Sequence, residues 1–96
     1  MLTNKQKRYL KGLANQKEAY FQIGKDGISY QQIQSINDAL LAHELIKIKL
    51  LKTSPLTVNE AAIEMAASTH SEIVQIIGRV IVLYRRSKKG VISLPK

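Results

Sequence analysis

The apolar residues of this chain recur with helical spacing in three segments. Each segment contains apolar pairs three and four positions apart, which lie on one face of an α-helix. The three sets are Tyr9, Leu10 and Leu13, then Ile33, Ile36 and Leu40, then Ala62, Met65 and Ala66. The spacing therefore predicts three amphipathic helices.

Each of these segments opens with a helix-capping signal, a Ser or Thr followed three residues later by Gln or Glu. In such a capping box the hydroxyl accepts a backbone N–H, and the later side chain accepts the N–H of the cap residue. The pairs predict where the helices start: Thr3 and Gln6, Ser29 and Gln32, Thr57 and Glu60.

Alternating or apolar segments between the helices predict strands. Segment 45–51 alternates, with Ile and Leu on one face and Lys47 and Lys49 on the other. Gly78 and Arg79 join two apolar runs, and this link suits a type II′ hairpin because glycine adopts a positive φ without steric cost. The predicted strands are 19–23, 45–51, 73–77 and 80–84, with 91–94 as a candidate edge strand.

The order helix, strand, helix, strand, helix, strand, strand predicts an α/β (α+β) fold, a two-layer sandwich. We expect the helices to pack on one face of a four-stranded mixed sheet. A chain of 96 residues holds one hydrophobic core, so residues 1–96 are expected to form a single domain.

The chain has a large excess of positive charge, with 15 Lys and Arg against 7 Asp and Glu and a net charge of +8. Such a surplus attracts polyanions, chiefly nucleic acid or an anionic membrane surface. A membrane role is disfavoured, since no predicted helix pairs a basic face with a broad apolar one and no apolar run could span a bilayer. The absence of cysteine excludes disulfides and thiol chemistry and agrees with a cytoplasmic location.

The sharpest local motif is the G-x-x-G loop formed by Gly24, Lys25, Asp26 and Gly27, which leads from a strand into a capped helix. Two glycines let the backbone approach a phosphate, and the start of the helix offers unpaired N–H groups. We expect Lys25 to add a cation, and the N–H groups of Gly27 and Ile28 to hold the phosphate. Alternatively, the glycines serve only a tight turn, and Asp26 argues against an anion site; the positive charge of the domain favours the binding interpretation.

Several cationic clusters could extend such a site. The acidic residues Glu60, Glu64 and Glu72 gather around the third helix instead, which predicts one basic side and one neutral-to-acidic side. The basic candidates are Lys7, Arg8 and Lys11 in the first helix, Lys47 and Lys49 in the second strand, and Arg85, Arg86 and Lys88 after the last strand.

Aromatic residues are few, so we expect recognition of phosphates and shape more than of individual bases. Tyr30, in the first turn after the G-x-x-G loop, is expected to be exposed at the site. Tyr84 is a candidate for stacking on a base, whereas Tyr9, Tyr20 and Phe21 are expected to fill the core.

No motif points to catalysis. His43 and His70 are the only histidines; they lack the spacing of a metal site, and they lie near predicted helix ends, where structural roles are favoured. No phosphate-binding P-loop, dinucleotide fingerprint or nucleophile elbow occurs. We therefore expect a monomeric binding protein, not an enzyme, without a catalytic residue, metal, cofactor or small-molecule substrate.

A second hypothesis is a protein-interaction module. In that case the apolar third helix would dock a partner while the positive charge only aids solubility. The docking residues would be Ala61, Ala62, Ile63, Met65, Ala66 and Ala67.

Taken together, these motifs resemble the bacterial YhbY family, the single-domain form of the CRM (chloroplast RNA splicing and ribosome maturation) domain. No single motif is specific, but their combination in this order is. The matching segments are 10–14, 24–27, 43–49, 77–85 and 92–95.

The resemblance implies a fold similar to the C-terminal domain of bacterial translation initiation factor 3. It also implies RNA binding through the G-x-x-G loop and the neighbouring basic surface, and association with ribosomal RNA in precursors of the large ribosomal subunit. Gly24 and Gly27 occupy the family's loop positions, while Lys25 and Asp26 stand at its free positions. This single copy makes a role in intron splicing, typical of multi-copy plant members, less expected.

Overall fold

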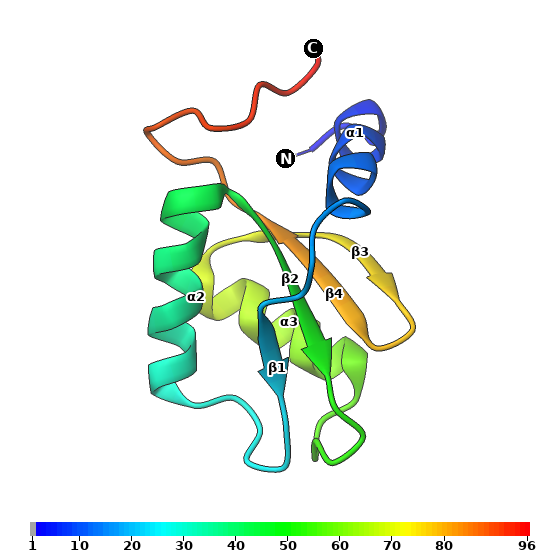
Figure 1. Ribbon diagram of the computed structural model, residues 1–96, viewed down its shortest axis with the longest axis vertical. Coiled ribbons are helices and arrows are strands. Elements are labelled where there is room, and N and C mark those ends of the chain that lie inside the picture. Colours follow the sequence, from blue (N-terminus) through cyan, green and yellow to red (C-terminus); the bar gives the residue numbers. More distant parts are fainter. Residues whose placement is uncertain (1) are drawn as a thin grey trace.

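The computed structural model describes residues 2–96 and has the predicted order of elements (Figure 1). The ends of these elements differ by small shifts from the predicted ones; the first strand, for example, is shorter than expected. The elements are α1 (Asn4–Ala14), β1 (Phe21–Ile23), α2 (Tyr30–His43), β2 (Leu45–Leu50), α3 (Val58–Thr69), β3 (Glu72–Ile77) and β4 (Val80–Tyr84).

The helix starts follow the capping signals. Thr3 and Thr57 form complete capping boxes with Gln6 and Glu60. At α2 the box is only half formed: Ser29 Oγ accepts the N–H of Gln32, but the Gln32 side chain donates to the carbonyl oxygen of Gln22 in β1, at 2.6 Å. The capping prediction is therefore confirmed for two helices and corrected for the third, where a tertiary contact takes the glutamine away.

The four strands form one mixed sheet in the order β1-β2-β4-β3. β1 runs parallel to β2, and the crossover between them is α2, whereas β4 is antiparallel to both of its neighbours. Ile77 pairs with Val80 around the two-residue turn, in which Gly78 has a φ of +56° and Arg79 does not have a positive φ. This geometry confirms the predicted hairpin.

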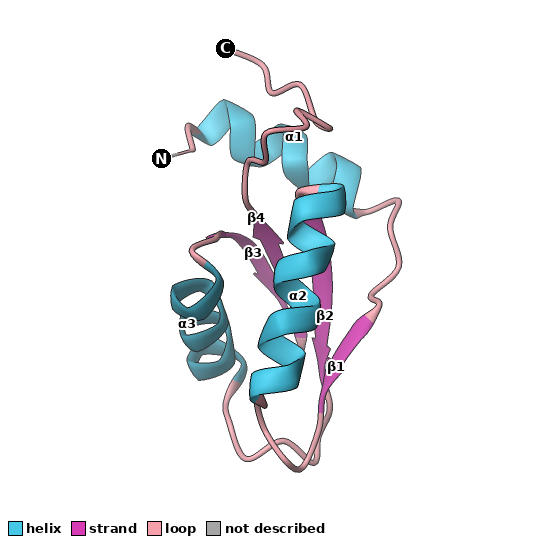
Figure 2. Ribbon diagram, turned by 90° about the vertical axis from the view of Figure 1, so that its left-hand side faces the viewer, coloured by secondary structure: helices cyan, strands magenta, loops and turns pink. Residues whose placement is uncertain are grey.

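Helices cover both faces of the sheet, which corrects the two-layer expectation. α2 and α3 pack side by side on one face, over a core that includes Ile48 and Ile81 (Figure 2). On the other face α1 contributes Leu10 and Ala14 to a second cluster with Val82 and Tyr84. The predicted α+β class and mixed sheet are confirmed, but α1 lies opposite α2.

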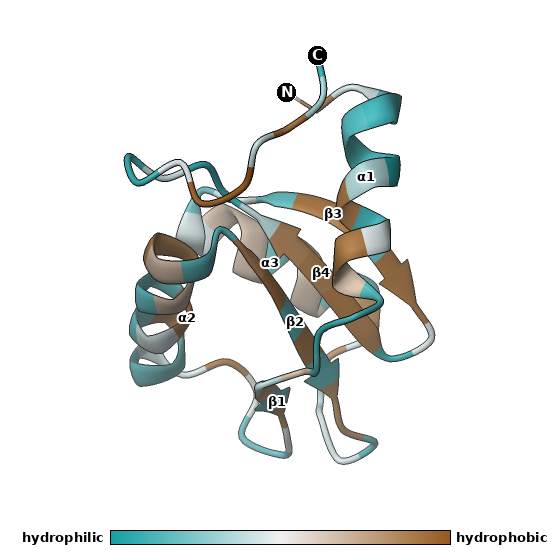
Figure 3. Cartoon of the chain, turned by 45° about the horizontal axis from the view of Figure 1, so that its top comes forward, coloured by the Kyte–Doolittle hydropathy of each residue, from teal (hydrophilic) through white to brown (hydrophobic). Residues whose placement is uncertain are grey.

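The chain after β4 completes the second cluster. Segment 91–94 is not a strand, so the expected edge strand is wrong; instead Ile92 and Leu94 pack against the cluster that α1 covers. Figure 3 shows this tail as a mix of apolar and polar stretches that passes over the same end of the sheet as α1. The tail thus acts as part of the core.

A buried carboxylate anchors this tail. Glu44, at the C-terminal cap of α2, accepts hydrogen bonds from the backbone N–H and the hydroxyl of Ser87 and from the N–H of Ile92, at 2.7–2.8 Å. Burial acts to raise the pKa of Glu44, but the hydrogen bonds from Ser87 and Ile92 outweigh it, and the net pKa lies below its usual value. The ionised carboxylate therefore ties the tail to the end of α2.

Candidate nucleic-acid interface

Three connections meet at the end of the molecule opposite the termini: the G-x-x-G loop, the β2–α3 loop and the β3–β4 turn. Figure 1 shows the first two side by side at the foot of the sheet. A Cβ placed on Gly24 would lie 3.5 Å from Leu51, and one on Gly27 would lie 3.6 Å from Pro55. The N–H of Leu50 donates to the carbonyl oxygen of Arg79 at 2.7 Å, which joins the turn to the same end. We call this surface the loop end.

Within the G-x-x-G loop only Gly27 has a backbone that favours glycine. Its φ is +68°, in the left-handed region, whereas Gly24 has no positive φ and only ordinary contacts around its Cα. The N–H of Gly27 donates to the carbonyl oxygen of Gly24 at 3.0 Å and closes the turn. This N–H is therefore not free for a phosphate, contrary to our expectation.

The free donors lie just after the turn. Among residues 2–96 no acceptor binds the N–H of Ile28 or of Ser29. Ser29 N–H stays free because the Gln32 side chain, which would cap it in a complete box, is bonded to β1. Both N–H groups lie at the start of α2, the positive end of its dipole, and such a place suits an anion.

Exposed cations lie on the connections that meet at this end of the molecule. Lys25 on the loop and Lys49 near the end of β2 were predicted, and both are exposed. The fold adds two exposed cations that the sequence reasoning missed, Lys52 after β2 and Arg79 in the hairpin turn; together with Pro55 they line a hollow of about 640 Å³. Only Asp26 opposes them on the loop itself, so positive charge dominates the loop end.

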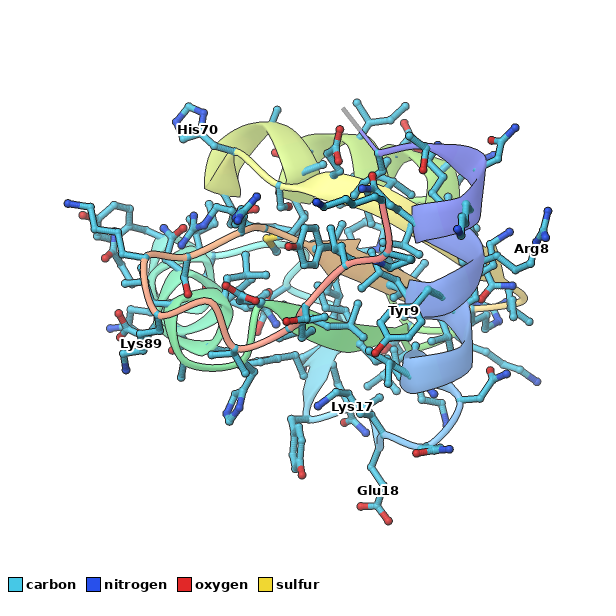
Figure 4. All side chains as sticks on the ribbon, turned by 90° about the horizontal axis from the view of Figure 1, so that it is seen from above. Arg8, Tyr9, Lys17, Glu18, His70 and Lys89 are labelled. Carbon is cyan, nitrogen blue, oxygen red and sulfur yellow. The ribbon has the colours of Figure 1, made fainter. Side chains whose placement is uncertain are left out.

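The α1 cations lie elsewhere. α1 packs at the other end of a molecule whose longest dimension is 39 Å, on the sheet face that bears Lys47 and Lys49. Arg8 points away from the body of the protein (Figure 4), while Lys7 and Lys11 are half-buried. The structure therefore does not bring Lys7, Arg8 and Lys11 together with the G-x-x-G loop.

The basic cluster after β4 divides in two. Arg85 is half-buried, and its guanidinium donates to the side chain and carbonyl oxygen of Asn37 and to the carbonyl oxygen of Thr69. These bonds join α2 to the end of α3, so Arg85 has a structural role in the fold. Arg86 and Lys88 are exposed. They belong to the tail, and Figure 1 shows the tail at the end of the molecule opposite the loop end.

The tyrosines differ most from expectation. Tyr30 is 75% exposed beside the G-x-x-G loop, as expected. Tyr84 is only 4% exposed, so its predicted stacking on a base is wrong; burial is the main reason that its pKa is raised. Tyr20 and Tyr9, expected in the core, are 78% and 43% exposed, whereas Phe21 packs against the core as expected.

The third helix offers little to a partner protein. Ala61, Ala62 and Met65 are completely buried against the sheet, and of the larger apolar residues in that set only Ile63 is exposed. None of the helices in residues 2–96 is long and apolar enough to cross a bilayer. The apolar face that suggested docking is thus the face that forms the core.

Comparison with known families identifies the family of this chain. A family model described as the CRS1/YhbY (CRM) domain matches residues 2–85. The chain belongs to the CRM domain family. The resemblance inferred from its motifs is thereby confirmed over nearly the whole chain.

Proteins similar to this CRM domain are named as RNA-binding proteins. It is 42% identical over 90 residues to the Probable RNA-binding protein YqeI of Bacillus subtilis, covering 94% of each chain. It is 37% identical over 99 residues to an RNA-binding protein of Haemophilus influenzae, covering 99% of this chain and 96% of the relative. The solution structure of the hypothetical protein SAV1595 from Staphylococcus aureus, whose description suggests RNA binding, matches with a TM-score of 0.77 and 45% identity, over 99% of this chain and all of that one.

Proposed function

We propose that this CRM-domain protein binds RNA and acts as an assembly factor on ribosomal RNA or on precursors of the large ribosomal subunit. The observation that carries the proposal is the loop end, which holds two free N–H groups at the start of α2 and exposed cations on the neighbouring connections. The names of its relatives support RNA as the polyanion. In this proposal the protein is a cytoplasmic monomer that binds its target and catalyses no reaction.

The proposed contact is made to the RNA backbone. A phosphate accepts the N–H groups of Ile28 and Ser29, and Lys25, Lys52 and Arg79 neutralise neighbouring phosphates. Such contacts position the protein without reading sequence. A folded RNA that presents its phosphates in a fixed arrangement is therefore the best ligand.

Crosslinking in the native cells tests the target. The protein is crosslinked to RNA, the attached RNA is sequenced, and the cell extract is sedimented through a gradient. We expect reads concentrated in large-subunit ribosomal RNA and the protein in pre-subunit fractions. Scattered or absent RNA reads, with the protein held in a nuclease-resistant complex, would instead show that it acts through a protein partner.

Salt dependence tests the kind of contact. Roughly four to six phosphate contacts predict that the logarithm of the binding constant falls with the logarithm of salt concentration with a slope of about −3 to −5. The measurement is a titration of labelled structured RNA at several salt concentrations. An affinity that hardly changes between low and moderate salt would contradict the electrostatic account.

A further inference from the structure

A second hollow lies beside the unpaired half of β2. β1 is short and pairs only with residues 48–50, so among the described residues no strand borders the edge of β2 over residues 45–47. Between this edge, the last turn of α2 and the linker before β1 lies a cavity of about 230 Å³. Pockets for drug-sized ligands are usually about 300–1,000 Å³, so this one has room for a single planar ring system.

The walls of this cavity suit a flat aromatic ligand. Phe21, Ala39 and Ile46 provide apolar surface, and His43 adds an imidazole from the end of α2. Tyr20 stands at its rim with 78% of its side chain exposed. An exposed aromatic ring beside an apolar hollow is the arrangement on which unpaired bases stack, because every base offers a π-face.

The hollow continues toward the C-terminal tail. A neighbouring depression of about 350 Å³ shares Lys17 and His43 with it and is lined by Tyr9 and Val91. Figure 4 shows Tyr9 and Lys17 on the same side of the molecule, between α1 and the linker. The two hollows form one groove with an exposed tyrosine at each end, which we call the tyrosine groove.

The positive charge at the rim of the groove favours a nucleic acid over a positively charged partner. Lys47 Nζ donates to the carbonyl oxygen of Lys17 at 3.1 Å, which holds one ammonium over the groove, and Lys17 is itself exposed. Glu18 also lines the groove, but its carboxylate points away from the protein body in Figure 4. The groove thus combines exposed tyrosine rings with lysine cations, groups that suit the bases and the phosphates of a nucleic-acid strand.

The tyrosine groove is also close to the loop end. The chain runs directly from Tyr20 through β1 to Gly24, a distance of about 13 Å at the usual rise of a strand. One flexible segment of RNA can therefore contact both surfaces. A paired helix cannot present its bases to the groove in this way, because its bases remain stacked inside the duplex.

We propose that the tyrosine groove binds unpaired nucleotides of the RNA whose backbone contacts the loop end, with Tyr20 stacking on a base. This inference rests on the proposed RNA-binding function and adds a ligand class to it: a structured RNA with a single-stranded segment beside the phosphates that the loop end holds.

The test compares two RNAs and four variants of the full chain. The probes are a fluorescent short oligouridylate and a blunt RNA duplex of the same length, each titrated at low salt. Tyr20→Ala should weaken binding of the single strand by roughly 5- to 150-fold, the range for loss of one base–aromatic stack, and leave duplex binding unchanged. Tyr20→Phe keeps the ring and should bind both probes like the wild type. Ile63→Ala removes a similarly exposed apolar side chain on α3 and should change neither.

Gly27→Asp at the loop end separates this inference from the proposed function, since it should weaken the binding of both probes. If Tyr20→Ala binds the single strand like the wild type while Gly27→Asp does not, the groove inference is overturned and the loop end stands. If Tyr20→Ala leaves RNA binding intact but releases a co-purifying protein, the groove belongs to a protein partner, which equally overturns it. Ultraviolet crosslinking supports the inference if the uridine adduct maps to Tyr20 or Tyr9.

Discussion

Gly27→Asp is expected to weaken RNA binding by roughly 10- to 100-fold at low salt, the scale of one lost charge-assisted hydrogen bond. Gly27 directly precedes the free N–H groups of Ile28 and Ser29. A carboxylate there would repel a bound phosphate and close the approach of the RNA backbone. The measurement is a titration of structured RNA against the folded variant, with folding verified by circular dichroism.

Gly27→Asn is the matched control for this change. Asn and Asp have nearly the same shape and tolerate the left-handed backbone at φ +68° better than other non-glycine residues, so both variants carry similar strain. The asparagine variant should therefore lose much less affinity. Equal losses in both would assign the effect to crowding of the backbone, and full affinity of a well-folded Gly27→Asp protein would remove the loop from the interface.

Glu44→Gln is expected to have the largest effect on stability, about 2–3 kcal/mol, because a buried carboxylate that accepts three hydrogen bonds is replaced by an amide whose NH₂ faces donors. For a domain of this size such a loss lowers the melting temperature by roughly 10–20 °C. Thermal unfolding measures it. Hydrogen exchange should also show faster exchange at the N–H groups of Ser87 and Ile92, since both donate to Glu44.

The same carboxylate predicts a pH dependence. The folded-state pKa of Glu44 lies below its unfolded value, so its stabilisation is present at neutral pH and is lost as the pH falls below about 4.3 through the lowered pKa. The difference in stability between wild type and Glu44→Gln should therefore shrink in acid. Glu64→Gln, the same change at an exposed site on α3, should alter stability by less than about 0.5 kcal/mol. An unchanged melting temperature in Glu44→Gln would show that the tail does not depend on this anchor.

The position and type of each main element could be read from the sequence because those signals are local. Thr3 and Thr57 cap helices through residues three positions away, and the hairpin at Gly78 needs only a positive φ at one glycine. The uninterrupted apolar run of β4 also indicates a strand that is buried on both faces, since such strands lack polar alternation. It did not say which segments would supply that cover.

Contacts between distant segments account for the wrong expectations. Tyr84 is buried because α1 and the tail close over the second face, and Tyr20 is exposed because β1 begins only after it. Arg85 bonds to Asn37 and Thr69, which lie 48 and 16 residues away in the chain. None of these contacts produces a recognisable sequence pattern near the residue concerned.

By itself, then, the sequence determined the helices and strands, the excess of positive charge, the glycine loop and, through the combined motifs, the CRM family. Only the tertiary structure decided which candidate residues share a surface. In the structure the α1 lysines lie far from the glycine loop, whereas Lys52 and Arg79 lie at the loop end. The Gln32 side chain donates to β1 and not to its own helix cap, so Ser29 N–H stays free. The physical reason is that caps and periodicity depend on neighbours in the chain, whereas charge clusters, free donors and grooves depend on strand order and on which face each helix covers.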